Sequence, residues 1–241
     1  MLKKLALSLG LGCAALPAAA DQALIISNGA FEGVRDIRAA YDAQRAVVAF
    51  RDAGFSVATL RDVNVDRMAS VLADFSARLD ENERVVIFLS GYFAEDGPNG
   101  LFMTSRLRGL SAFNLDSRGL DLEPVMDLLA KHPGRSLLVL GSPAGRFNDQ
   151  GELQDSGSRN LVRAPQGVAV AEGVPAALAD RITRLLVDPT VPMSNVFRGR
   201  DVRAYGYLPN HGTFLEAGVN VPPPPPPVDH DALWWDVVRA I

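Results

Sequence analysis

Two apolar segments, each ending at a glycine, constrain the fold of this chain more than any other feature. Residues 84–93 have the sequence RVVIFLSGYF, and residues 136–145 have the sequence SLLVLGSPAG. Near-continuous apolar runs of this length are typical of buried strands in a parallel sheet, and the glycine marks the turn where each strand surfaces. In open α/β sheets, ligands and catalytic groups lie at this carboxyl edge. A functional site is therefore expected just after Ser90 and Leu140.

Predicted strands and amphipathic helices alternate around these two segments. Apolar or alternating runs predict the strands, and apolar residues at helical spacing predict the helices. The expected strands cover residues 23–27, 55–60, 84–90, 136–140 and 166–171. The expected helices cover residues 35–53, 64–79, 121–131, 175–187 and 191–205. This order predicts a parallel sheet covered by helices on both faces.

Two longer stretches are expected to be irregular. Residues 93–119 are polar, and they predict at most a short hairpin around residues 101–103. Residues 147–165 are rich in Gly, Ser, Asn and Asp, a composition typical of a long exposed loop.

The first twenty residues have the composition of a secretory signal peptide. Lys3 and Lys4 precede an apolar run over residues 5–16, which is too short to span a bilayer, and Ala20 follows as part of a small-residue cleavage site. Cleavage after Ala20 predicts a periplasmic or secreted protein without an integral membrane segment. A buried N-terminal helix and a lipoprotein anchored at Cys13 are the alternatives.

The charge and cysteine content of the chain exclude several classes of function. The net charge of −4 and the isoelectric point near 5.4 argue against a nucleic-acid-binding surface. Cleavage of the signal peptide removes the only cysteine, so the mature chain has no thiol and can form no disulfide. The chain lacks a glycine-rich phosphate loop, and no cofactor is expected.

The end of the chain carries a polyproline spacer followed by an amphipathic segment. Residues 221–228 include an unbroken run of prolines, which favours an extended spacer between the domain at 21–220 and the last helix at 229–241. That helix would place apolar side chains on one face: Leu233, Trp234, Val237, Val238 and Ile241. It either docks on its own domain or is presented to a partner.

Several short motifs follow one another in a specific order. The chain begins this series with ALIISNGAFEGV at 23–34, continues with Asp42-Ala43 and AGFSV at 53–57, and reaches VVIFLSGYF at 85–93. In this order and spacing the chain resembles the bacterial caspase-like domains of the peptidase C14 clan, which includes caspases and metacaspases. The similarity covers residues 23–145 and extends more weakly to 241. It implies a three-layer α/β/α fold with a mostly parallel six-stranded sheet.

The resemblance also implies where catalytic residues would stand. In that family, a histidine after the third strand activates a cysteine after the fourth, and the thiolate attacks the scissile carbonyl. The corresponding positions hold Tyr92 and Pro143, with Phe93 in place of the second glycine of a Gly-His-Gly motif. Proline is no nucleophile and has no N–H, and an unperturbed tyrosine with a pKa near 10 is no general base near neutrality.

These substitutions predict a catalytically inactive, secreted pseudo-protease that binds or scaffolds a peptide or protein. The surface expected to bind this peptide or protein is a groove at the carboxyl edge of the sheet. The candidate groove residues are Asn28, Gly91, Phe93, Gly141 and Ser142, beside the degenerate dyad of Tyr92 and Pro143. Tyr92 and Phe93 would either line an open, peptide-binding groove or fill it. The oligomeric state stays open.

Two other functions compete with this interpretation. A hydrolase could use Ser142 as a nucleophile, but none of the three histidines (His132, His211, His230) follows a predicted strand at its carboxyl end. Alternatively, the alignment is shifted and the chain is another doubly wound binding domain. Metal binding is not expected, because Asp96, Asp116 and Asp121 are scattered in or beside a solvated loop.

Overall fold

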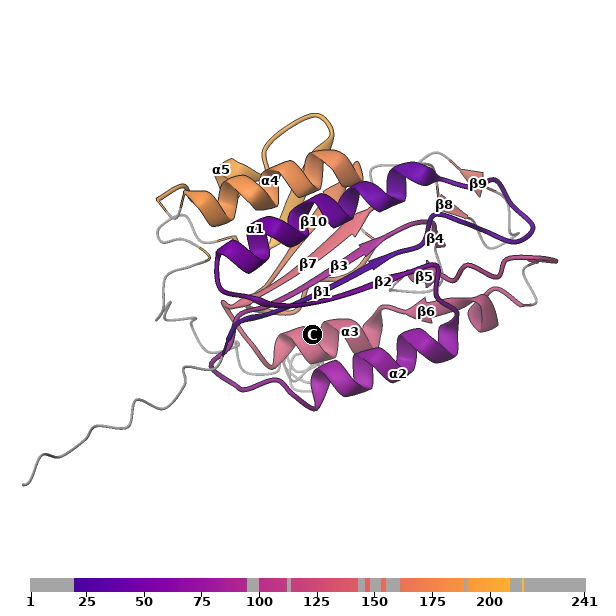
Figure 1. Cartoon of the computed structure of the whole chain (residues 1–241), viewed down its shortest axis with the longest axis horizontal. Helices are drawn as coiled ribbons and strands as arrows, with labels where there is room; N and C mark the ends of the chain where they lie inside the picture. Colours follow the sequence, from indigo (N-terminus) through magenta and orange to yellow (C-terminus); the bar gives the residue numbers. More distant parts are fainter. Residues whose placement is uncertain are drawn as a thin grey trace, which may run out of the picture.

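The structure is a computed structural model that describes residues 20–94, 100–111, 114–142, 146–147, 153–154, 161–188, 190–208 and 214 (Figure 1). The expected signal peptide, the polyproline spacer, the C-terminal helix and Pro143 lie outside the described residues, as do Asp96, His211 and His230.

The core of the molecule is a six-stranded sheet with the strand order β11-β10-β7-β3-β1-β2. Its strands are β1 (Gln22–Ser27), β2 (Ser56–Arg61), β3 (Val85–Ser90), β7 (Ser136–Gly141), β10 (Val168–Gly173) and β11 (Val202–Gly206). Neighbouring strands are parallel except at the edge, where β11 runs antiparallel to β10. The predicted mostly parallel six-stranded sheet is thereby confirmed.

Helices cover both faces of this sheet, as Figure 1 shows. One face carries the 3₁₀ helix η1 (Arg38–Arg45), α1 (Ala46–Asp52), α4 (Pro175–Val187) and α5 (Met193–Val196). The other face carries α2 (Val65–Ser76) and α3 (Glu123–Ala130). Each helix layer packs its apolar face on the sheet and forms its own hydrophobic cluster, so the fold has three layers.

The central strands have the apolar sequences that their position requires. Every residue of β3 and of β7 is buried, because helices cover both sides of these strands. The predicted cap of α2 is also present: Asn64 Oδ1 accepts a hydrogen bond from the Arg67 backbone N at 2.9 Å. Such a cap stabilises a helix by about 1 kcal/mol. Met68 and Phe75 of α2 are buried against the sheet.

Two of the expected helices differ from the structure. Residues 35–53 do not form one helix, since the 3₁₀ helix η1 precedes the shorter α1. The prediction of a helix over residues 191–205 is wrong: it contains the single turn α5, which follows Pro192, and the strand β11. β11 supplies the sixth strand by pairing with β10, a long-range contact that overrides local helical spacing.

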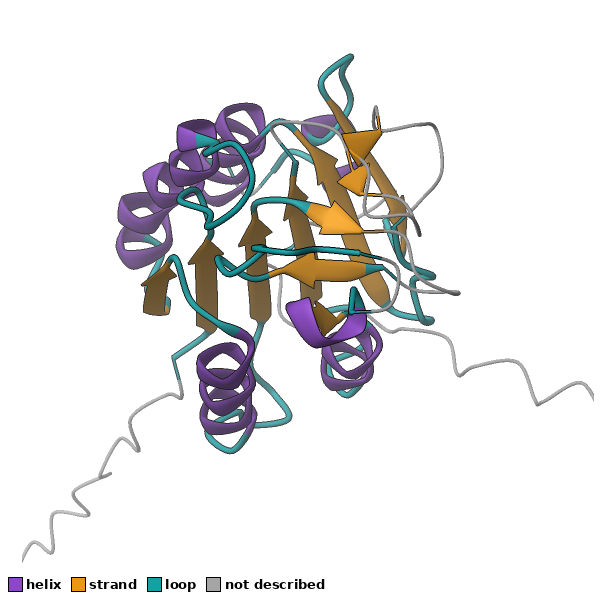
Figure 2. Cartoon of the chain, turned by 90° about the vertical axis from the view of Figure 1, so that its right-hand side faces the viewer, coloured by secondary structure: helices purple, strands orange, loops and turns teal. Residues whose placement is uncertain are grey.

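A second, smaller sheet lies across the carboxyl edge of the main sheet (Figure 2). Its strand order is β6-β5-β4-β8-β9. The strands are β4 (Phe93–Ala94), β5 (Leu101–Met103), β6 (Gly119–Asp121), β8 (Arg146–Phe147) and β9 (Leu153–Gln154), and the short helix η2 (Asp116–Arg118) precedes β6. The described parts of the stretches 93–119 and 147–165 therefore contain short strands, and the hairpin expected around residues 101–103 is among them. Leu107, Leu115 and Leu161 are buried within them.

Among the residues that the structure describes, no helix combines the length and the apolar character that a membrane span needs.

Candidate functional site

The strand ends at the carboxyl edge are aligned by the register of the sheet. Ser90 of β3 pairs with Ser27 of β1 on one side and with Gly141 of β7 on the other. Tyr92 follows Ser90 by two residues, as position 143 follows Gly141. The register therefore puts the residues at which β3 and β7 end, Ser90 and Gly141, side by side at the carboxyl edge. Pro143 itself lies outside the described residues.

Asn28 and Gly91 hold strand ends together and expose no groove surface. The buried Asn28 side chain donates from Nδ2 to the Met103 O at 3.0 Å and accepts from the Val63 N at 3.0 Å. Gly91 N donates to the Gly141 O. A Cβ at Gly91 would lie 3.0 Å from the Asn28 O, so the close approach of these two strand ends favours glycine.

Tyr92, at the position where the resemblance predicts the family's histidine, is a core residue. Its side chain is only 2 % exposed, and its ring packs on Phe31 with a centroid distance of 4.9 Å. The phenol hydroxyl donates a hydrogen bond to the Arg35 O at 3.1 Å. The ring belongs to a hydrophobic cluster between the loop after β1 and the small sheet. Tyr92 therefore fills the space at this strand end.

The environment of Tyr92 also disfavours proton abstraction. Burial raises the pKa of the phenol, with Asp36 adding to the effect and Arg35 opposing it. A phenol whose pKa lies above its ordinary value near 10 stays protonated at neutral pH. It can donate a hydrogen bond, but it cannot act as the general base that a thiol or hydroxyl nucleophile needs.

Phe93 is fully buried on the other side of the same chain segment. It starts β4, which pairs with β5, and its ring packs against Phe102 of that strand at a centroid distance of 5.2 Å. Of the two possibilities that the sequence leaves open, the second holds for Tyr92 and Phe93: both side chains fill the interior. Neither side chain lines an open groove.

Ser142 is the candidate residue that reaches a pocket. Gly141 is buried at the end of β7, whereas Ser142 is half-buried and its backbone N donates to the Gly173 O at 2.9 Å. Ser142 lines a pocket of about 340 Å³ together with Glu172, Arg200 and Asp201. This pocket lies between the ends of β7 and β10 and the start of β11.

Glu172 is the buried acid of this pocket, and its carboxylate is already engaged. Its oxygens accept hydrogen bonds from the Leu161 N at 2.9 Å, from Arg203 Nη2 at 2.6 Å and from the Tyr205 hydroxyl. Burial and the Glu172 charge raise the pKa of Tyr205. Because a guanidinium, a phenol and a backbone N–H already donate to this carboxylate, Glu172 serves to join β10, β11 and Leu161 rather than to accept a proton from Ser142.

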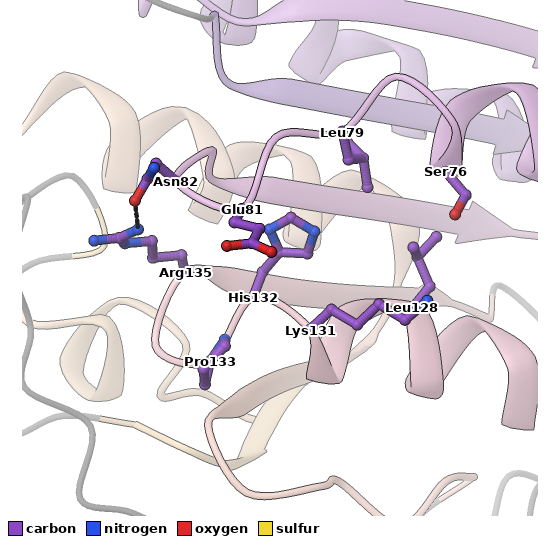
Figure 3. A pocket seen from close by; sticks show the side chains of 9 residues that line it. All are labelled: Ser76, Leu79, Glu81, Asn82, Leu128, Lys131, His132, Pro133 and Arg135. Carbon is purple, nitrogen blue, oxygen red and sulfur yellow. Dashed lines mark hydrogen bonds between the residues drawn. The ribbon is translucent and has the colours of Figure 1, made fainter.

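His132, the histidine that the structure describes, is remote from Ser142. It lies between α3 and the first residue of β7, whereas Ser142 follows the last residue, so the length of β7 (about 20 Å) separates them. Figure 3 shows His132 in a pocket of about 550 Å³, near Glu81 and Lys131. Burial lowers the pKa of His132, while Glu83 opposes this effect.

The turn after β1 contains an interaction that the sequence analysis missed. Asp62, in a left-handed conformation with φ 51°, accepts hydrogen bonds from the Gly29 N at 2.8 Å, the Ala30 N at 2.9 Å and the Tyr41 hydroxyl. Burial and Asp62 raise the pKa of Tyr41 to about 12. Successive backbone N–H groups in a turn can bind an external anion, but here the chain's own carboxylate occupies them.

The sequence predicts a site at the carboxyl edge of the sheet, but the sequence analysis missed the contacts of Glu172 and Asp62 there. Glu172 could have been found from the sequence, because a charged residue in the apolar run VAVAEG needs a partner when it is buried. No comparable signal marks Asp62. Within the described ranges, no three side chains of His, Cys, Asp or Glu come together as metal ligands.

Comparisons with known proteins agree on the fold. The Drosophila initiator caspase Dronc is similar in structure, with a TM-score of 0.52 at 10 % sequence identity, over 77 % of this chain and 79 % of that chain. In a comparison with curated proteins, no sequence matches the chain. The peptidase C14 sequence profile, described as the caspase domain, matches residues 20–167. Because this match covers more than half of the sequence, the chain belongs to the caspase-domain family.

Proposed function

We propose that this chain is a catalytically inactive caspase-family domain, exported to the periplasm or secreted, that acts by binding or scaffolding a peptide or protein partner. The observation that carries this proposal is the burial of Tyr92 at the position of the catalytic histidine. The mature chain that the signal peptide predicts contains no cysteine, so it lacks the nucleophile as well as the base.

The burial of Tyr92 and Phe93 decides which surfaces could bind a partner. An extended peptide cannot occupy space that these rings already fill, so binding would fall to the surfaces around them. At the carboxyl edge, the pocket beside Ser142 offers both volume and exposed polar groups, with Arg200 and Asp201 at its rim.

A hydrolase that uses Ser142 is the second candidate, because Ser142 does reach this pocket. Two observations argue against this hydrolase. Glu172 is held by Arg203 and Tyr205, and His132 lies at the opposite edge of the sheet. Neither is in a position to take the proton of the serine hydroxyl.

Turnover by residues 21–241 tests the proposal. The protein is incubated with a mixed library of peptide and ester substrates, in parallel with the Ser142→Ala variant. We expect no turnover from either protein, together with saturable binding of an uncleaved peptide or a partner. Turnover by the unaltered chain that the variant lacks would contradict the proposal and identify Ser142 as a nucleophile.

Export is tested separately. Expression of the full chain, followed by cell fractionation and mass determination of the isolated protein, should give a product that begins at Asp21 in the periplasm or medium. A cytoplasmic protein that retains residues 1–20 would contradict this part of the proposal.

A further inference from the structure

An exposed apolar groove lies between α1 and α4, on the helix layer opposite α2 and α3. It has a volume of about 310 Å³. The structure exposes three large apolar side chains among the described residues, and two of them, Val48 (64 % exposed) and Val187 (75 % exposed), lie in this groove. Ala49 and Leu186 complete its floor, while Arg45 and Asp52 stand at its polar rim.

The described chain ends on the same layer and near the same end of the molecule. α1 and α4 both run back from the carboxyl edge, so the groove around Val187 lies at the amino edge of the sheet. β11 is antiparallel to β10 and also finishes at the amino edge. After it, Leu208 and Phe214 pack into the hydrophobic cluster under α1 and α4. Residues 215–241 follow Phe214, which belongs to the same hydrophobic cluster as Ala49 and Leu186 of the groove.

The remaining segment has the length and the pattern to reach and fill this groove. Residues 215–228, with their proline run, can span on the order of 40 Å at ~3.1 Å per residue. Residues 229–241 equal the 13-residue α4 in length and would form a helix of about 20 Å. The helical spacing puts Leu233, Trp234, Val237 and Ile241 on one side.

We propose that residues 229–241 dock as an amphipathic helix in the α1–α4 groove of their own chain. Docking would cover Val48 and Val187 with the apolar face of the segment, and each apolar side chain removed from water favours this state. The proline spacer keeps the segment at a high effective concentration over the groove. This inference is independent of the proposed function, because it concerns the helix layer and not the strand ends.

Tryptophan fluorescence of residues 21–241 provides a direct test. Both tryptophans of the sequence, Trp234 and Trp235, lie in this segment, so the emission of the whole protein reports on the segment alone. We expect emission at shorter wavelength and weaker acrylamide quenching than for the free peptide 229–241. Emission and quenching equal to those of the free peptide would overturn the proposal.

Substitutions identify the groove as the docking site. Val48→Asp and Val187→Asp should shift the emission to that of the free peptide, because each puts a charge on the apolar surface. Both side chains are exposed, so the domain should stay folded. Val174→Asp is the matched control, since Val174 is 41 % exposed but lies outside the groove. A blue-shifted spectrum that all three variants retain would overturn the assignment.

Dilution distinguishes docking within one chain from docking between two. The blue-shifted emission should not depend on protein concentration, and sedimentation should give the monomer mass. Emission that shifts to longer wavelength on dilution, together with a dimer at high concentration, would overturn docking within one chain and assign the groove to the segment of a second copy.

Discussion

The hydroxyl and the ring of Tyr92 both make contacts inside the folded domain. The hydroxyl donates to the Arg35 O, and the ring packs on Phe31 within a closed hydrophobic cluster. A residue with these contacts contributes to folding stability. A side chain that lined an open groove would contribute little, because solvent would replace its contacts.

Substitution of Tyr92 separates these two roles. Tyr92→Phe removes one hydrogen bond and should lower the free energy of unfolding by about 1 kcal/mol. Tyr92→Ala also leaves a cavity and should lower it by about 3–5 kcal/mol. Urea denaturation of the two variants measures both effects. Unchanged stability of Tyr92→Ala would show that the ring faces solvent.

His132 should make folding stability depend on pH. Burial lowers its pKa below the ordinary value of about 6.5, while Glu83 and Asp80 oppose the shift and Arg135 supports it. The unfolded state therefore binds more protons as the pH falls below about 6.5, and stability is lost in that range.

Urea denaturation of wild type and His132→Gln between pH 8 and pH 5 measures this contribution. The variant should lose less stability than wild type as the pH falls, although acidic residues add a common decrease at the lower end. Equal pH slopes for wild type and His132→Gln would rule out the role of His132.

The edge pair β10–β11 depends on one buried charge. Glu172 of β10 accepts hydrogen bonds from Arg203 and Tyr205 of β11, so the ion pair and the phenol join the two strands. Removal of one partner leaves the other charge desolvated without compensation. Arg45 and Asp180 form a second arginine–carboxylate ion pair, and both of its side chains are exposed to solvent.

These two ion pairs should differ in their effect on stability. Glu172→Gln should lower the free energy of unfolding by roughly 2–4 kcal/mol, because Arg203 is only partly exposed. Asp180→Asn should change it by less than about 1 kcal/mol. Urea denaturation gives both changes in the free energy of unfolding. Faster hydrogen exchange of the β11 amides in Glu172→Gln would show that the loss of stability lies at the β10–β11 pair. Equal effects of the two substitutions would contradict the structural role of Glu172.

Elements with a strong local signal were predictable from the sequence, and elements made by pairing were not. The Asn64 cap and the helix Pro175–Val187 follow from side chains a few residues apart. β11 and the two-residue strand β4 are too short to show a period, and only their partner strands define them. The predicted hairpin around residues 101–103 is present as β5, whereas its partner β4, which buries Phe93 against Phe102, was missed.

The two strand ends were predictable from the sequence, but the burial of Tyr92 was not. The two apolar runs predict strands that end near Ser90 and Leu140, and the register pairs Ser90 with Gly141. Whether Tyr92 points into a groove or into the core depends on Phe31 and Arg35, which the sequence does not connect with it.

On the scale of the whole molecule, the chain has the sheet of the caspase-domain family, and buried side chains cover the carboxyl ends of several of its strands. The mostly parallel six-stranded sheet and the three layers are those expected for the family. The small sheet, the Tyr92 cluster and the Asp62 contacts fill the ends of β1, β2 and β3. Because one fold hosts many functions, the family's fold does not by itself assign an activity to this chain.

The most direct test of this account is proteolysis by residues 21–241 that carry both Tyr92→His and Pro143→Cys. These substitutions restore the residue types of the dyad. Peptide cleavage and urea denaturation are measured on the same preparation. The account predicts no cleavage and a lower free energy of unfolding, because the imidazole would replace a phenol inside the core. A variant that cleaves peptides and keeps wild-type stability would show that position 92 faces a substrate groove, and would contradict the account.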